Sequence, residues 1–88
     1  MAAVTVDRRD FNVIGDLRVE SGQIDIAADG DTLELISIKE IYYVAATSAT
    51  DNGIGATVAN ASGSTKATIT WQIGGSAENN AQFIAIGK

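Results

Sequence analysis

Hydrophobic and polar residues alternate with period two along most of the chain. Between residues 65 and 73, the odd positions from 67 onward are apolar and include Trp71, while the even positions are polar. Alternation of this kind predicts a half-buried β-strand. The upstream apolar positions of residues 54–58 share one parity, and Ser-Gly-Ser at 62–64 supplies turn residues, so residues 54–73 are predicted to form a hairpin.

A second hairpin is predicted at residues 10–26. Gly15 and Asp16 form a two-residue turn signal between two apolar stretches. After this turn the apolar residues lie at odd positions, but from Ile24 onward they lie at even positions. The change of parity predicts a β-bulge at residues 21–22 that bends the strand.

The rest of the chain also follows a strand pattern. Residues 39–47 and 81–86 are predicted strands, residues 32–38 a kinked strand or short irregular bridge, and residues 74–80 a loop. No segment has the period of a helix. The sequence therefore predicts one all-β domain over residues 1–88, a small antiparallel β-sandwich or β-barrel of about seven or eight short strands.

The amino-acid composition excludes most kinds of catalytic site. The chain has no His, Cys or Pro, which excludes His-assisted nucleophiles, disulfides and the usual zinc ligands. The acidic residues around one turn, Asp25, Asp29, Asp31 and Glu34, were the one candidate calcium site, but they lack EF-hand spacing, and Asp-Gly-Asp is common in ordinary turns. We therefore expect no enzymatic activity, no cofactor and no metal site.

Net charge and hydrophobic length exclude two classes of partner. The formal net charge is −5, which argues against binding a nucleic-acid backbone. No apolar run approaches the ~18 residues of a membrane helix, and the first residues do not resemble a signal peptide. Synthesis in the cytoplasm is the expectation.

Charge is divided unevenly between the two halves of the chain. Residues 1–40 hold nine acidic and four basic residues, whereas residues 41–88 hold two of each. Cores of protein interfaces are depleted of charge in this way, although a plain buried sheet with small-residue loops gives the same composition. Tyr42 and Tyr43 are adjacent on one predicted strand, so at least one must face away from the core, whereas Trp71 is expected in the core. The candidate residues for contacts with other subunits are Tyr42, Tyr43, Ile54, Val58, Thr68, Thr70 and Phe83.

Three segments carry a resemblance to a known class of proteins. Residues 9–19 (RDFNVIGDLRV) and 22–26 (GQIDI) resemble the N-terminal hairpin of small virion proteins of tailed bacteriophages, and residues 83–87 (FIAIG) are similar to their C-terminal strand. The resemblance implies an all-β decoration or cement protein on the capsid surface of the virion, which clamps subunits of the major capsid protein. The matching positions are turn and strand residues, so no functional residue is carried over.

The resemblance and the charge pattern together predict how the protein assembles. We expect a homo-oligomer, a trimer on the capsid, held through residues 41–88, with the acidic half facing solvent. Two alternatives stay open: another virion component, such as a tail, connector or fibre-base module, and a soluble carbohydrate-binding β-sandwich that uses Trp71 or a tyrosine as a stacking platform.

Overall fold

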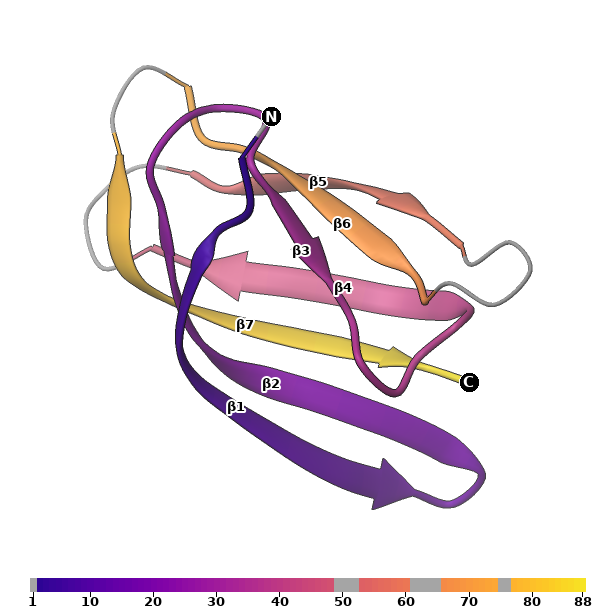
Figure 1. Ribbon diagram of the computed structural model, residues 1–88. Helices are drawn as coiled ribbons and strands as arrows, with labels where there is room; N and C mark the ends of the chain where they lie inside the picture. The colour runs from indigo at the N-terminus through magenta and orange to yellow at the C-terminus, as the bar shows by residue number, and fades with distance from the viewer. Residues whose placement is uncertain (1, 49–52, 61–65, 75–76) are drawn as a thin grey trace.

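Two antiparallel sheets pack face to face in the computed structural model (Figure 1). The structure describes residues 2–48, 53–60, 66–74 and 77–88. The strands are β1 (Thr5–Ile14), β2 (Leu17–Ile26), β3 (Thr32–Glu34), β4 (Ile41–Thr47), β5 (Gly55–Ala59), β6 (Thr68–Gln72) and β7 (Glu78–Gly87). The larger sheet has the order β1-β2-β7-β4 and the smaller sheet the order β3-β6-β5. The predicted small all-β sandwich is thus confirmed, and no helix occurs in the described ranges.

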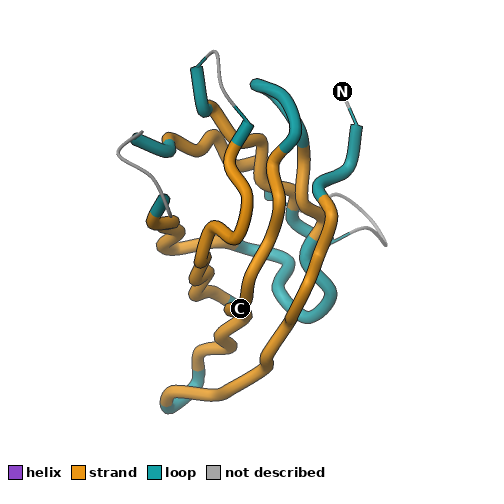
Figure 2. The backbone as a smooth tube through the Cα atoms, turned by 90° about the vertical axis from the view of Figure 1, so that its left-hand side faces the viewer, coloured by secondary structure: helices purple, strands orange, loops and turns teal. Residues whose placement is uncertain are grey.

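Both predicted hairpins are present. β1 and β2 pair around Gly15, whose φ of 59° is the left-handed conformation that a two-residue hairpin turn requires. Figure 2 shows this hairpin extending beyond the ends of the other strands. β5 pairs with β6 in the second hairpin, whose predicted turn at 62–64 lies outside the described residues. Residues 32–38 form a three-residue strand followed by irregular chain, and the predicted loop 74–80 ends earlier because β7 begins at Glu78.

The predicted bulge at Ser21 and Gly22 is wrong. Both residues lie in regular register with β1 and β7, and the bulges fall elsewhere, between Val6 and Arg8 of β1 and opposite residues 24–26 on β7. A Cβ at position 22 would lie 1.9 Å from the Arg8 carbonyl oxygen. Gly22 therefore permits close approach of β1 rather than a bend, and the change of parity needs another explanation, given below.

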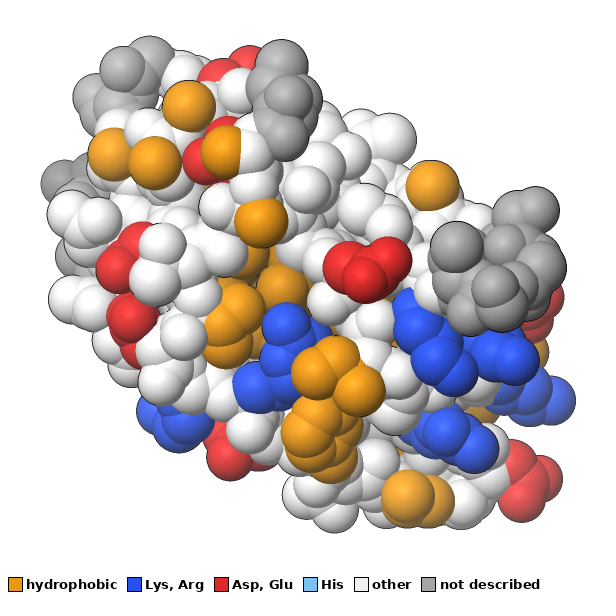
Figure 3. All heavy atoms as spheres, viewed as in Figure 1, with side chains coloured by type: hydrophobic (Ala, Val, Ile, Leu, Met, Phe, Trp, Pro, Cys, Tyr) orange, Lys and Arg blue, Asp and Glu red, His pale blue; other side chains and the backbone are white. Residues whose placement is uncertain are grey.

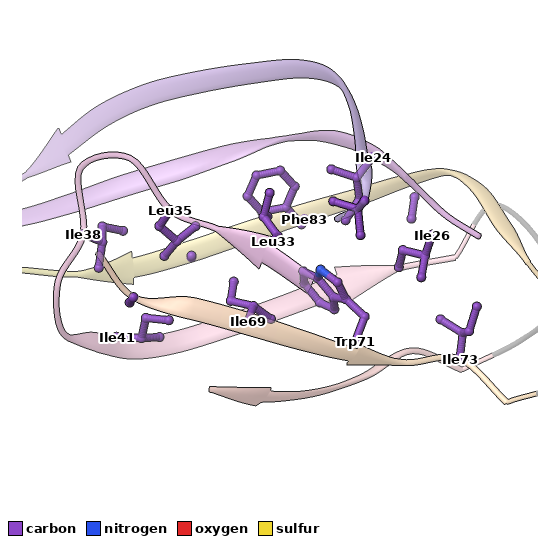
Figure 4. Packing of buried hydrophobic residues seen from close by; sticks show 14 residues of the cluster. Ile24, Ile26, Leu33, Leu35, Ile38, Ile41, Ile69, Trp71, Ile73 and Phe83 are labelled. Carbon is purple, nitrogen blue, oxygen red and sulfur yellow. The ribbon is translucent and has the colours of Figure 1, made fainter. Parts of the chain in front are cut away.

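The core lies between the sheets. Trp71 is fully buried, as predicted, and its ring meets that of Phe83 edge-on, with the ring centroids 6.5 Å apart and the planes at 64° (Figure 4). Branched aliphatic side chains surround this pair, including the fully buried Ile24, Leu35 and Ile69. β2, β3, β4, β6 and β7 each contribute at least one buried hydrophobic side chain, whereas β1 and β5 contribute none, so strands of both sheets are held in one core.

The connection between β3 and β4 is fastened to the larger sheet by a buried carboxylate. Glu20 of β2 is fully buried and accepts hydrogen bonds from the main-chain N–H groups of Ile36 and Ser37, from the Ser37 hydroxyl and from Arg9. Burial acts to raise the pKa of Glu20, but these hydrogen bonds outweigh it and hold the pKa below its ordinary value of 4.5. The irregular segment after β3 is thereby fixed in one position against β2.

Candidate functional site

The strand order turns the uneven charge of the sequence into two sides of the sandwich. β1, β2 and β3 come from residues 1–40, and β4, β5, β6 and β7 come from residues 41–88. β1 and β2 form one end of the larger sheet and β3 one edge of the smaller sheet, so the later strands make up the rest of both sheets. β1 alone carries four charged residues, and β2 carries three. β4, β5 and β6 carry none, and the one charge of β7, Glu78, is fully buried. We call β4–β7 the low-charge side.

Glu78 does not contribute charge to the surface. It is fully buried and accepts a hydrogen bond from the Ser48 hydroxyl at the end of β4. A buried carboxylate whose hydrogen-bonding capacity is satisfied in this way orders the start of β7 and the adjacent end of β4. The exposed surface of these four strands is therefore built from uncharged side chains alone.

Two edge strands bound the low-charge side. β4 is the edge of the larger sheet and β5 the edge of the smaller sheet, and the two lie next to each other. All five residues of β5, Gly-Ala-Thr-Val-Ala, are exposed. Natural proteins protect edge strands with charge, Pro, bulges or a covering segment, because free N–H and C=O groups invite pairing with another chain. β5 has no charge, no Pro and regular pairing with β6, so within the described residues it lacks these three protections, and we call it an unprotected edge.

Both predicted tyrosines are exposed on β4. Tyr42 is 52% and Tyr43 57% exposed, and the register shift between Ile41 and Tyr43 places Tyr42 in a bulge. A hydrogen bond with Glu40 is the main cause that raises the pKa of Tyr42 above 10.0. Tyrosine is enriched in protein interfaces because it offers a large apolar ring with a polar end. The expectation that at least one tyrosine faces away from the core is confirmed.

The remaining candidate residues for contacts with other subunits differ in how exposed they are. Val58 of β5 is 41% exposed, and Ile54, just before β5, is partly buried against the core. Thr68 and Thr70 lie half-buried on β6, beside β5. Phe83 is 3% exposed and packs on Trp71, so it belongs to the core and is removed from the candidate surface.

A second apolar surface was missed from sequence. Val19 of β2 pairs with Ile86 of β7, which pairs with Tyr43 of β4, and all three project from the face of the larger sheet opposite the core. We call this the outer patch, and it also includes Leu17 and Ile84. The smaller sheet packs on the other face, but only part of the outer patch is open to solvent: Tyr43 is 57% exposed, Leu17, Ile84 and Ile86 are half-buried, and Val19 is only 6% exposed. The change of parity in β2 is the sequence feature that indicates this patch. The apolar side chains at odd positions of β2 point to the outer patch, and those at even positions point to the core.

Three of the four acidic residues weighed as calcium ligands act as local structural groups. Asp29 accepts a hydrogen bond from the Ile73 N–H at 2.8 Å, Asp31 from the Ala28 N–H at 3.1 Å, and Asp25 from the Asn80 N–H at 2.8 Å. Across the described ranges, no three acidic, His or Cys side chains come together as a metal site would require. The described chain likewise includes no helix that is long and apolar enough to cross a membrane.

Comparison with known proteins adds no identity. The chain matches no protein-family model, and neither the curated proteins nor the solved structures include a match to it. The function is therefore argued from the surfaces described above.

Proposed function

We propose that this protein is a non-enzymatic assembly protein, a bacteriophage capsid decoration or cement protein that binds the assembled shell of the major capsid protein. The observation that carries the proposal is the low-charge side: four strands whose only charge is buried, ending in an unprotected edge and two exposed tyrosines. Surfaces of this kind are typical of interface cores. The resemblance of residues 9–19, 22–26 and 83–87 to small phage virion proteins supports the identity of the partner.

The size of the surface suits this role. A standard interface takes about 800 Å² from each partner, and the whole chain exposes 4861 Å². β4, β5 and the adjoining outer patch provide a continuous uncharged border on which such an area can form. A ligand that binds only the assembled shell stabilises that shell by its binding free energy, and many copies on one particle multiply the effect.

Self-association is the second part of the proposal. The unprotected β5 edge suits pairing with a second copy or with a capsid strand, and we expect a homo-oligomer, with a trimer favoured by the threefold positions of icosahedral shells. Residues 1–40, with nine acidic and four basic residues, then face solvent and keep the particle surface acidic. In this proposal the protein is located on the surface of the virion.

Of the two kinds of aromatic stacking platform expected for a soluble carbohydrate-binding protein, Trp71 or a tyrosine, only the tyrosines are exposed. Trp71 is fully buried and cannot stack on a sugar, which leaves Tyr42 and Tyr43 as the exposed aromatic pair. A glycan array with the wild-type chain separates the two functions, because a decoration protein gives no specific signal. A tail, connector or fibre-base role uses the same surfaces, and immunogold labelling of purified virions distinguishes it by position.

The experiment that tests the proposal places charge on the low-charge side. Val58→Asp and Tyr43→Asp introduce a carboxylate at exposed positions of β5 and β4, and Ala27→Asp introduces one at an exposed turn outside it. A carboxylate desolvated without a partner costs several kcal/mol. We expect the first two variants to sediment as monomers and to lose binding to purified empty capsid shells, while Ala27→Asp behaves as wild type.

The readouts separate folding from assembly. Circular dichroism first confirms that each variant retains the β spectrum and a cooperative melt. If folded Val58→Asp and Tyr43→Asp both associate and decorate shells as wild type does, the low-charge side is not the interface and the proposal fails. Thr68→Asp on the outer surface of the smaller sheet then shows whether that neighbouring face is used instead.

A further inference from the structure

Four of the six basic residues gather at one end of the molecule. Arg18, Lys39, Lys66 and Lys88 come from four separate segments and line one hollow of about 400 Å³ together with Asp16 and Ser37. Figure 3 shows Lys and Arg side chains collected at the end where the β1–β2 turn and the C-terminus lie, with hydrophobic side chains beside them. The hollow carries four positive charges against one negative charge in a chain whose net charge is −5.

These four are the bases that the rest of the described chain leaves without an ion pair. The two ion pairs between described residues join Arg8 to Asp10 and Arg9 to Glu20, so they use the other two bases. Lysines that have no ion pair among the described residues repel one another when they lie close together, and an anionic partner relieves that repulsion. The concentration of positive charge therefore indicates a ligand with several negative groups.

An apolar hollow adjoins the basic one. It has a volume of about 320 Å³, is lined by Phe11, Asn12 and Val13, and shares Arg18 and Ser37 with its neighbour. Phe11 is 53% and Val13 67% exposed. Both project toward the core side of the larger sheet, but the smaller sheet does not reach them because β3 ends at Glu34. A contiguous apolar patch beside a concave surface, rimmed by polar residues, is typical of a ligand-binding groove.

The two hollows share Arg18 and Ser37, and we call them together the groove. Arg18 donates a hydrogen bond to the Ser37 carbonyl oxygen at 3.2 Å, and Arg9 donates one to the Glu34 carbonyl oxygen at 3.4 Å, so both arginines tie the hairpin to the segment after β3. Glu20 holds the same segment through Ser37. The groove is thus formed before any ligand binds, which lowers the entropic cost of binding.

We propose that this groove binds an extended acidic segment of a partner protein, with an apolar side chain seated against Phe11 and Val13 and successive carboxylates placed along the lysines. An acidic peptide fits better than a nucleic acid, because the chain as a whole repels a continuous phosphate backbone. Lysines on flexible stems suit several carboxylates spread along a chain, whereas a single phosphate is usually held by arginine forks or main-chain N–H groups. This inference does not rest on the proposed function, since the groove and the low-charge side use different elements.

The probe is a fluorescein-labelled peptide in which a Phe-Leu pair is followed by four Glu, measured by fluorescence anisotropy with the full chain. Two control peptides carry Gln in place of Glu, or Ser-Ser in place of Phe-Leu. We expect binding of the probe that weakens as salt is raised, and at least tenfold weaker binding of each control peptide. Equal affinity for the Gln peptide would overturn the proposal.

Variants of the protein locate the site. Lys39→Gln/Lys88→Gln removes two exposed charges of the groove, and Phe11→Ser removes its apolar anchor. Loss of one exposed charge pair weakens binding by about threefold, so the double variant, which loses two, should bind the peptide roughly tenfold more weakly. Arg8→Gln, which removes an exposed charge outside the groove, should bind within about twofold of wild type.

Other outcomes also decide the question. If Arg8→Gln weakens binding as much as the double variant does, the effect is net charge and not a site. If a single-stranded oligonucleotide displaces the peptide at equal concentration of charge, the groove is a general polyanion site and the proposal is wrong. Because Val58→Asp leaves the groove intact, retention of peptide binding by that variant separates failure of this inference from failure of the assembly interface.

Discussion

Replacement of Glu20 by Gln tests whether one buried carboxylate fastens the segment after β3 to the larger sheet. In the wild-type chain, Oε1 accepts from Arg9 at 2.9 Å, and Oε2 accepts from the Ser37 N–H at 2.7 Å and the Ser37 hydroxyl at 2.9 Å. The Ile36 N–H lies within 3.1 Å of both oxygens. Gln presents one oxygen and one NH₂ group, so either Arg9 or Ser37 must face a donor instead of an acceptor.

The expected loss follows from these contacts. A hydrogen bond to a charged group contributes about 1.5–3 kcal/mol, and breaking a buried ion pair from one side costs about 3–5 kcal/mol. Since Gln keeps one acceptor, we expect Glu20→Gln to lower the free energy of unfolding by about 2–4 kcal/mol. A chain of this length has a total of about 4–13 kcal/mol, so the midpoint of thermal unfolding should fall by about 10 °C or more.

The dependence on pH gives the second readout. The pKa of Glu20 is lower in the folded state than its ordinary value of 4.5, so its contribution is complete above that value and is lost as the pH falls through the folded pKa. The difference between wild type and Glu20→Gln should therefore be constant near neutral pH and shrink below pH 4.5. Urea unfolding of both proteins, followed by tryptophan fluorescence at several pH values, measures this difference in the free energy of unfolding.

A matched variant guards against a general effect of charge. Glu34→Gln removes an exposed carboxylate from β3, in the adjoining segment, and should change the free energy of unfolding by less than about 0.5 kcal/mol. The reasoning is refuted if Glu20→Gln unfolds at the same midpoint as Glu34→Gln, or if its deficit stays constant down to pH 3.

Three further predictions address the backbone, the acidic turn and the exposed tyrosine. Gly22→Ala should cost at least about 3 kcal/mol in urea unfolding, because its Cβ would lie 1.9 Å from the Arg8 carbonyl oxygen, whereas Gly53→Ala meets open space and should be neutral. Addition of EDTA should leave the melting temperature unchanged, since a structural metal would add its binding free energy to stability; a fall of several degrees would contradict this. Glu40→Gln should lower the pKa of Tyr42 in a spectrophotometric titration, and an unchanged curve would show that the hydrogen bond with Glu40 does not raise it.

The fold could be predicted from local pattern where a strand alternates strictly or a turn has a clear signal. β6 shows one apolar parity through Trp71, and Gly15-Asp16 marks the first hairpin turn. The bulge was misplaced because a bulge and a strand with two apolar faces produce the same change of parity in one sequence. Only the pairing of β2 with both neighbours distinguishes them.

The surfaces were harder to predict than the fold. The low charge of residues 41–88 was visible in the sequence, but the strand order that places β4 and β5 at adjacent edges was not. Phe83 and Ile84 look equivalent as apolar neighbours, yet β7 directs the first into the core and the second to the outer patch. The basic groove joins residues as far apart as Arg18 and Lys88, so sequence spacing carried no signal for it.

Apolar residues on both faces of the larger sheet have a consequence for how the protein exists in solution. A sheet with one solvated face alternates apolar with polar residues, whereas a sheet covered on both faces is apolar throughout. β7 is of the second kind in its C-terminal half, where Phe83 and Ala85 face the core and Ile84 and Ile86 face outward. Full burial of an exposed isoleucine contributes about 1.5–3 kcal/mol, and since Ile84 and Ile86 are already half-buried, covering one of them contributes part of that amount. The outer patch therefore favours a state in which another protein surface covers it, which is the condition that a decoration protein meets only on its particle or in its own oligomer.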